Sequence, residues 1–141
     1  MNNSKKMKLM IVCLLSIYIT GTSLVAFQLT TPWIVPDKYV NVPNPVKADA
    51  KSIAAGKALY TVNCESCHGK KGIGNGSKAP DLKTIPGNFT LATFQSQTDG
   101  TIFYKMTEGR NEMPKAKKDL PDDIDRWNLV NYLRTFAVQK K

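Results

Sequence analysis

Two cysteines, separated by two residues and followed at once by a histidine, constrain this chain more than any other feature. They form the pattern C-x-x-C-H over the residues Cys64-Glu65-Ser66-Cys67-His68. Residues three apart on a helical turn lie on one face, so two thiols at this spacing can reach two vinyl groups on one porphyrin edge. The histidine that follows brings its imidazole beneath the iron. The pattern therefore predicts one covalently attached haem c.

The same residues suit zinc or a redox dithiol less well. Structural zinc takes four protein ligands, mainly cysteine and histidine. The chain has one histidine and three cysteines, and Cys13 is far from the pair in sequence. A zinc site would therefore have to recruit carboxylates. A thioredoxin-like dithiol needs a βαβ context, and no segment shows the alternation of a strand.

An electron carrier needs its iron bound on both faces, and a single histidine excludes two histidine ligands. A methionine thioether favours ferrous iron and raises the reduction potential. Met106 falls inside an expected helix, where methionine commonly fills the core. Met113 precedes Pro114 in an expected loop. The sequence thus predicts His68 and Met113 as the iron ligands, with Met106 or a lysine of residues 115–118 as alternatives.

Three segments of the chain have the residue patterns of helices. One helix is expected from Ala50 to about Asn63, with Asp49 as its N-cap. A second runs from Asp99 to Glu108 and ends at Gly109. The last starts at Pro121, runs to about Val138 and carries a broad apolar face. These patterns predict an all-α fold, and residues 84–97 follow none of them.

An uncharged apolar run near the N terminus indicates export. Residues 9–27 carry no charge over 19 positions and follow a basic flank, residues 1–8. At about 1.5 Å per residue this run nearly spans the ~30 Å apolar core of a bilayer, which favours a retained membrane anchor. The alternatives are a cleaved signal peptide, which would release a soluble secreted form, and a lipidated Cys13. Each alternative leaves the domain outside the cytoplasm, on the periplasmic side.

A proline-rich segment separates this run from the expected helices. Residues 28–48 contain four prolines, which favour an extended, semi-rigid tether, so a haem domain is expected over residues 49–141. The formal net charge is +9. Because an exported chain rarely meets nucleic acid, this charge indicates acidic protein partners or an ordinary solvated surface. Lysines 70, 71, 115, 117 and 118 flank the two segments that hold the expected iron ligands.

In this order and at these spacings, the elements resemble class I cytochrome c over about residues 50–138. Gly56 and Tyr60 precede Cys64 at intervals of four, similar to the glycine and aromatic residue of the family's first helix. Gly109 stands four residues before Met113, which Pro114 follows, similar to the family's ligand segment. The resemblance implies three to four helices round one buried haem c with hexacoordinate iron.

The resemblance also implies a role for Pro80 and a function. In the segment Ala79-Pro80-Asp81-Leu82, the Pro80 carbonyl would accept a hydrogen bond from the second nitrogen of His68. Iron with six ligands leaves no open position for a substrate, so a carrier is expected and not an enzyme. The expected role is one-electron transfer between donor and acceptor redox proteins of a respiratory chain. The alternatives are a haem subunit of a larger membrane oxidoreductase complex, and a haem sensor or peroxidase.

Overall fold

The computed structural model describes residues 32–137. The basic flank and the apolar run of residues 9–27 lie outside these described residues, so their predicted roles stay predictions. Residues 33–137 belong to one compact unit. Within residues 32–137, every helix falls short of a membrane span in length or in apolar character.

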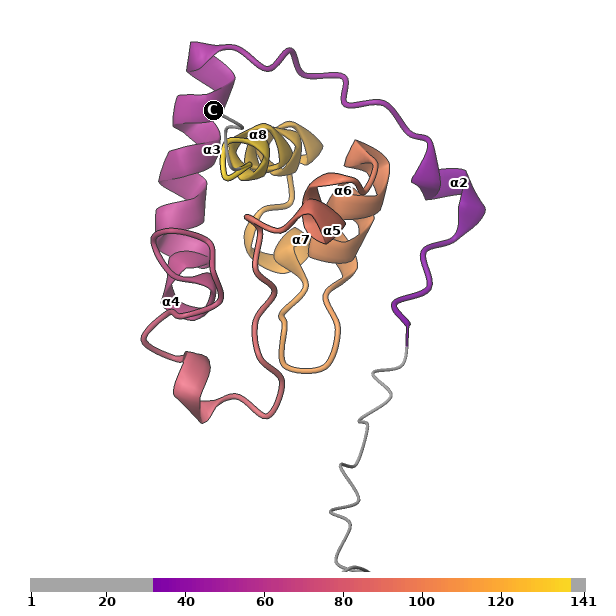
Figure 1. Ribbon diagram of the computed structural model, residues 1–141. Helices are drawn as coiled ribbons and strands as arrows, with labels where there is room; N and C mark the ends of the chain where they lie inside the picture. Colours follow the sequence, from indigo (N-terminus) through magenta and orange to yellow (C-terminus); the bar gives the residue numbers. More distant parts are fainter. Residues whose placement is uncertain (1–31, 138–141) are drawn as a thin grey trace, which may run out of the picture. The chain divides into compact units, whose positions relative to one another are not determined.

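Two crossing helices form the frame of this unit (Figure 1). The first, α3 (Ala50–Asn63), begins as predicted, because the Asp49 side chain accepts a hydrogen bond from the Ser52 amide. The second, α8 (Asp123–Arg134), begins later than Pro121. Asp122 takes the N-cap position there and accepts from the Ile124 amide. Pro121, which has no N–H to donate, therefore lies before the helix and not in its first turn.

The crossing of α3 and α8 depends on Gly56. A Cβ atom on this residue would lie 2.1 Å from the Asn128 carbonyl oxygen of α8. Two atoms that are not bonded to each other cannot pack at so short a distance. The residues that fill the contact are Tyr60, Leu129 and Val130, which are almost completely buried. The absence of a side chain at residue 56 therefore sets how closely the two helices approach.

Shorter helices complete the fold. Helix α6 (Asp99–Glu108) has the predicted bounds, with Thr98 as its N-cap and Gly109 at its end in a left-handed conformation, φ +60°. The others are α4 (Glu65–His68), the 3₁₀ helix η1 (Ala79–Asp81), α5 (Ala92–Gln95) and α7 (Ala116–Asp119). Helix α5 lies within residues 84–97, the segment for which the sequence predicted no helix. The fold is all-α, as predicted, since residues 32–137 form no strand beyond a single bridge between Arg110 and Met113.

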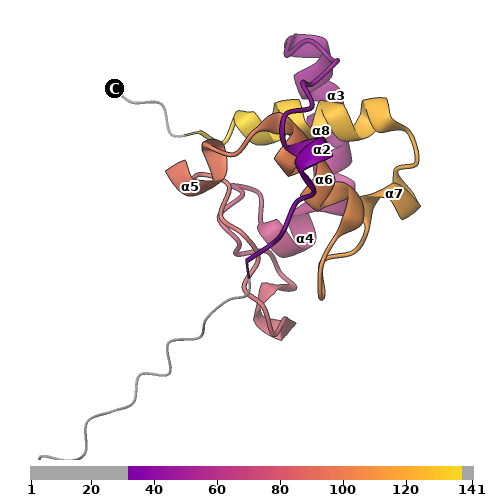
Figure 2. The ribbon, with the colours of Figure 1, turned by 90° about the vertical axis from the view of Figure 1, so that its right-hand side faces the viewer.

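The described part of the expected tether packs on the helices, which differs from the extended, semi-rigid tether that its prolines predicted. We call residues 33–48 the N-terminal strap. It contains α2 (Asp37–Val40), which lies against α6 (Figure 2). Asn44 donates a hydrogen bond to the Asn131 side chain of α8 at 2.8 Å. Prolines restrict the local backbone, but they do not prevent the side chains between them from finding distant partners.

Candidate functional site

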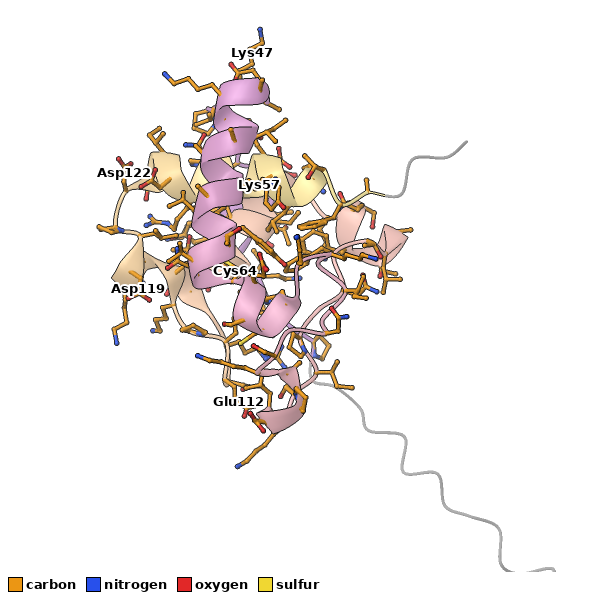
Figure 3. All side chains as sticks on the ribbon, turned by 90° about the vertical axis from the view of Figure 1, so that its left-hand side faces the viewer. Lys47, Lys57, Cys64, Glu112, Asp119 and Asp122 are labelled. Atoms are coloured by element: carbon orange, nitrogen blue, oxygen red, sulfur yellow. The ribbon has the colours of Figure 1, made fainter. Side chains whose placement is uncertain are left out.

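The two cysteines and the histidine lie on one helical turn. Cys64 follows the last residue of α3, at the lower end of that helix in Figure 3, while Cys67 and His68 belong to α4. The turn is closed by the His68 amide, which donates to the Cys64 carbonyl at 2.9 Å. Both thiols are free and partly buried. The structure therefore brings the three residues of the motif together as the spacing predicted.

The His68 ring is held in one orientation by two contacts. Its Nδ1 lies 3.1 Å from the Gly87 carbonyl oxygen, and its ring stacks on Phe89 with centroids 4.4 Å apart. Nδ1 must donate to the carbonyl, which leaves the lone pair on Nε2. Burial lowers the pKa of His68 below its usual value, although the Gly87 hydrogen bond opposes this shift. A neutral, oriented imidazole with a free Nε2 suits a metal ligand.

The carbonyl at His68 is not that of Pro80, which corrects the expectation drawn from the resemblance. Pro80 lies within η1, an exposed 3₁₀ turn. The chain returns to the histidine at Gly87. There the Phe89 amide donates a hydrogen bond to the Gly72 carbonyl at 2.7 Å, which holds the backbone next to Gly87 in place. The sequence signal for this approach is a second proline, Pro86, directly before Gly87.

The motif opens into an apolar pocket. Cys64, His68 and Met113 all line it, and the cavity volume is about 210 Å³. This volume is smaller than the about 300–1,000 Å³ of typical small-molecule sites, so the character of the lining, and not the size, indicates what the pocket could hold. The walls are mainly aromatic and aliphatic: Phe89, Phe94, Ile102, Leu129 and Leu133. An apolar lining of this kind suits a flat apolar cofactor better than a bare ion.

Both candidate methionines reach this pocket, but from different surroundings. Met106 lies inside α6 and is 6% exposed, as part of the hydrophobic core. Met113 is partly buried and lies beyond the end of α6, where its amide and carbonyl pair with those of Arg110 at 2.9 and 3.0 Å. The Met113 side chain is therefore supported by a backbone turn and is not built into a helix.

One lining residue that the sequence analysis missed is Lys105. The expected lysine alternative was the cluster at residues 115–118, in which Lys117 forms an ion pair with Glu108 at 2.7 Å. None of that cluster lines the pocket, whereas Lys105 does. Its position one residue before Met106, in a helix that borders the pocket, is the only hint that the sequence contains.

These observations fit a covalent haem. Two cysteines that form no disulfide stand on one turn, the His68 ring directs Nε2 away from its backbone partner, and a thioether shares the pocket. Apolar walls keep water away from a porphyrin. The described residues contain no cluster of three or more acidic, histidine or cysteine side chains placed to hold a metal ion directly.

Comparison with known proteins agrees with this interpretation. The family model "Cytochrome C oxidase, cbb3-type, subunit III" matches residues 51–133. The chain belongs to this family. It is therefore a class I c-type cytochrome, and such a domain implies a covalent haem c and electron transfer. Cytochrome c domains usually lie outside the cytoplasm. The N-terminal strap precedes the part of the chain that the family model matches.

Two relatives are much longer than this cytochrome c domain. Over 56 residues it is 43% identical to the quinohemoprotein alcohol dehydrogenase ADH IIB of Pseudomonas putida, a region that covers 40% of this chain and 8% of that protein. A chain of the Kuenenia stuttgartiensis reducing HAO-like protein complex superposes with a TM-score of 0.61 at 28% identity. That match covers 80% of this chain and 54% of the other.

Proposed function

We propose that this cytochrome carries a single haem c and passes single electrons between redox proteins. Cys64 and Cys67 would hold the haem covalently, and His68 and Met113 would bind its iron. The observation that carries the proposal is that Cys64, His68 and Met113 line one apolar pocket. When bound, the haem supplies a one-electron couple between ferric and ferrous iron.

The surroundings of the two methionines support Met113 as the second ligand. Met106 packs among buried side chains of the core, where moving its sulfur would leave a void. Met113 projects from a turn that Gly109 begins, so its thioether can reach a ligand without deforming a helix. A thioether at this position would favour the ferrous state.

The remaining residues position and protect these ligands. The hydrogen bond from Nδ1 of His68 to Gly87 fixes the ring orientation and strengthens donation from Nε2. Phe89 holds the ring plane by stacking. With both His68 and Met113 bound, the iron would have no position left for a substrate, so we propose a carrier and not an enzyme.

The attachment is tested by intact mass and visible spectrum of the matured protein. We expect the wild type to exceed a Cys64→Ser/Cys67→Ser variant by the mass of one haem, and only the wild type to show a c-type spectrum. Cys13→Ser is the matched control, because this cysteine is not in the motif, and it should keep the haem. A colourless wild type with the mass of the bare chain would contradict the proposal.

Exposed lysines near the ligand segments support docking with acidic partners. Lys115 and Lys118 are exposed and follow Met113 closely, and Lys118 has no ion pair among the described residues. Reversing both charges should slow electron transfer to an acidic partner at low ionic strength, with the difference disappearing as salt is added.

The matched control for this charge reversal uses Lys47 and Lys51. Both are exposed and lie at the end of α3 opposite Cys64, where Figure 3 shows Lys47. Changing them to glutamate alters the net charge equally but should leave the transfer rate much closer to that of the wild type. Equal rates for both double variants across the salt series would refute a specific docking face.

We further propose that residues 9–27 anchor this cytochrome in a membrane of a respiratory chain, on the extracytoplasmic side.

The strap supports a second candidate, a haem subunit of a larger membrane oxidoreductase. Only residues 28–32 separate the apolar run from the compact unit, and five residues span at most about 18 Å. Such a short link limits the reach of a shuttle. Co-purification with large redox partners in mild detergent would favour the subunit, whereas isolation alone would favour the carrier.

A further inference from the structure

Polar groups cluster at one part of the otherwise apolar pocket. Trp33, Gln97 and Lys105 all line the pocket. The Lys105 ammonium donates to the Gln97 side-chain oxygen at 2.6 Å and lies 5.8 Å from the centroid of the Trp33 ring. The Arg110 guanidinium lies 5.6 Å from the same ring. Two cations thus lie close to one indole, and of these two Lys105 is the one that lines the pocket.

This arrangement places like charges near each other. Burial lowers the pKa of Lys105, and the charge of Arg110 lowers it further. The charge of a partly buried lysine is stabilised by an anion beside it. A negatively charged group in the pocket would therefore stabilise the charge of Lys105.

Trp33 reaches this place because the N-terminal strap is docked on α6, the helix that also carries Lys105. The Tyr39 and Tyr104 rings meet with centroids 4.7 Å apart. A Cβ atom on Gly100 would lie 2.0 Å from the Tyr39 carbonyl oxygen, so the strap lies directly on the helix. The family model begins at residue 51, so the strap lies outside the part of the chain that the model matches.

A haem c keeps two carboxylates after both thioether bonds have formed. Carboxylates at the border of an apolar pocket need cationic or hydrogen-bonding partners. We infer that Trp33 and Lys105, with Arg110 close to the Trp33 ring, form the carboxylate-binding end of the haem pocket, which the N-terminal strap completes. This inference rests on the proposed function, because it takes the haem as the ligand.

The charge of Lys105 then acts on the reduction potential. Ferric haem carries one more positive charge than ferrous haem, and a nearby cation that also neutralises a carboxylate disfavours the ferric state. Removing this charge should lower the potential. Lys105→Met removes the charge at similar length, and Lys105→Arg keeps it.

The experiment compares haem-loaded variants of the full chain by potentiometric titration and by the resonance Raman bands of the haem carboxylates. We expect a lower potential and shifted carboxylate bands in Lys105→Met, with both restored in Lys105→Arg. Lys57→Met is the charge control, because Lys57 is exposed on α3 and does not line the pocket. It should leave both measurements unchanged.

The strap is tested in the same way through Trp33. We expect Trp33→Leu to shift the potential in the same direction as Lys105→Met, whereas Ile34→Ala, at a neighbour that is 81% exposed, should not. If haem-loaded Lys105→Met has the same potential and the same carboxylate bands as Lys57→Met, this inference is wrong, while the proposed function stands. A Lys105→Arg variant with a potential as low as that of Lys105→Met would also overturn the inference. A wild type without haem would overturn the proposed function and this inference together.

Discussion

Met113→Leu is expected to lower the reduction potential of the haem by a large fraction of the ~0.8 V range over which axial ligands set haem potentials. Leucine keeps the volume and apolar character of the side chain but removes the sulfur, so the iron would lose the proposed ligand that favours its ferrous state. The visible absorption spectrum should also change, because the iron would have one ligand fewer. Potentiometric titration followed by visible absorption measures both effects.

Met106→Leu is the matched control, since this methionine lines the same pocket from the core of α6. A methionine-to-leucine exchange in a core generally costs less than about 1.5 kcal/mol, and the potential should remain close to that of the wild type. If Met106→Leu gave the large fall and Met113→Leu did not, the ligand assignment would be reversed.

Gly56→Ala is expected to reduce the free energy of unfolding by about 2 kcal/mol, although alanine usually stabilises a helix by about 1 kcal/mol relative to glycine. The added methyl carbon would lie 2.1 Å from the Asn128 carbonyl oxygen and 2.8 Å from the Tyr132 Cβ atom. The helices would have to separate, and overpacking of this kind costs about 1–3 kcal/mol or more. Denaturant unfolding of the haem-loaded protein measures the loss.

Ala54→Gly provides the comparison on the same helix. Ala54 is exposed, so this change should cost about 1 kcal/mol through helix propensity alone. The two variants together separate propensity from packing, because propensity predicts opposite signs for them. A Gly56→Ala variant as stable as the wild type would show that α3 and α8 can move apart freely, against the close crossing described above.

Local signals were sufficient for several helix boundaries. The Asp49 side chain and the Gly109 conformation act within a few residues of themselves, so the starts and ends of α3 and α6 followed from the sequence. The start of α8 shifted because Asp122 and Pro121 competed for adjacent positions, and the aspartate could cap the helix. Such choices differ by small free energies, which the pattern alone does not resolve.

The acceptor for His68 shows where local signals end. Pro80 matched a family motif, but Gly87 lies at the imidazole because the chain between them loops out and returns. That return depends on a backbone hydrogen bond to Gly72 and on the stacking of Phe89. Both are contacts between residues far apart in sequence, and the turn propensities of the loop do not encode them.

By itself the sequence determined the kind of fold and the chemistry of its motif, since the spacing of Cys64, Cys67 and His68, the helix caps and the apolar periodicity all act over one or two turns. Only the tertiary structure decided that the proline-rich strap packs on α6, and that Trp33 and Lys105 border the pocket. These placements follow from the shapes of surfaces that exist only after α3, α6 and α8 have packed together.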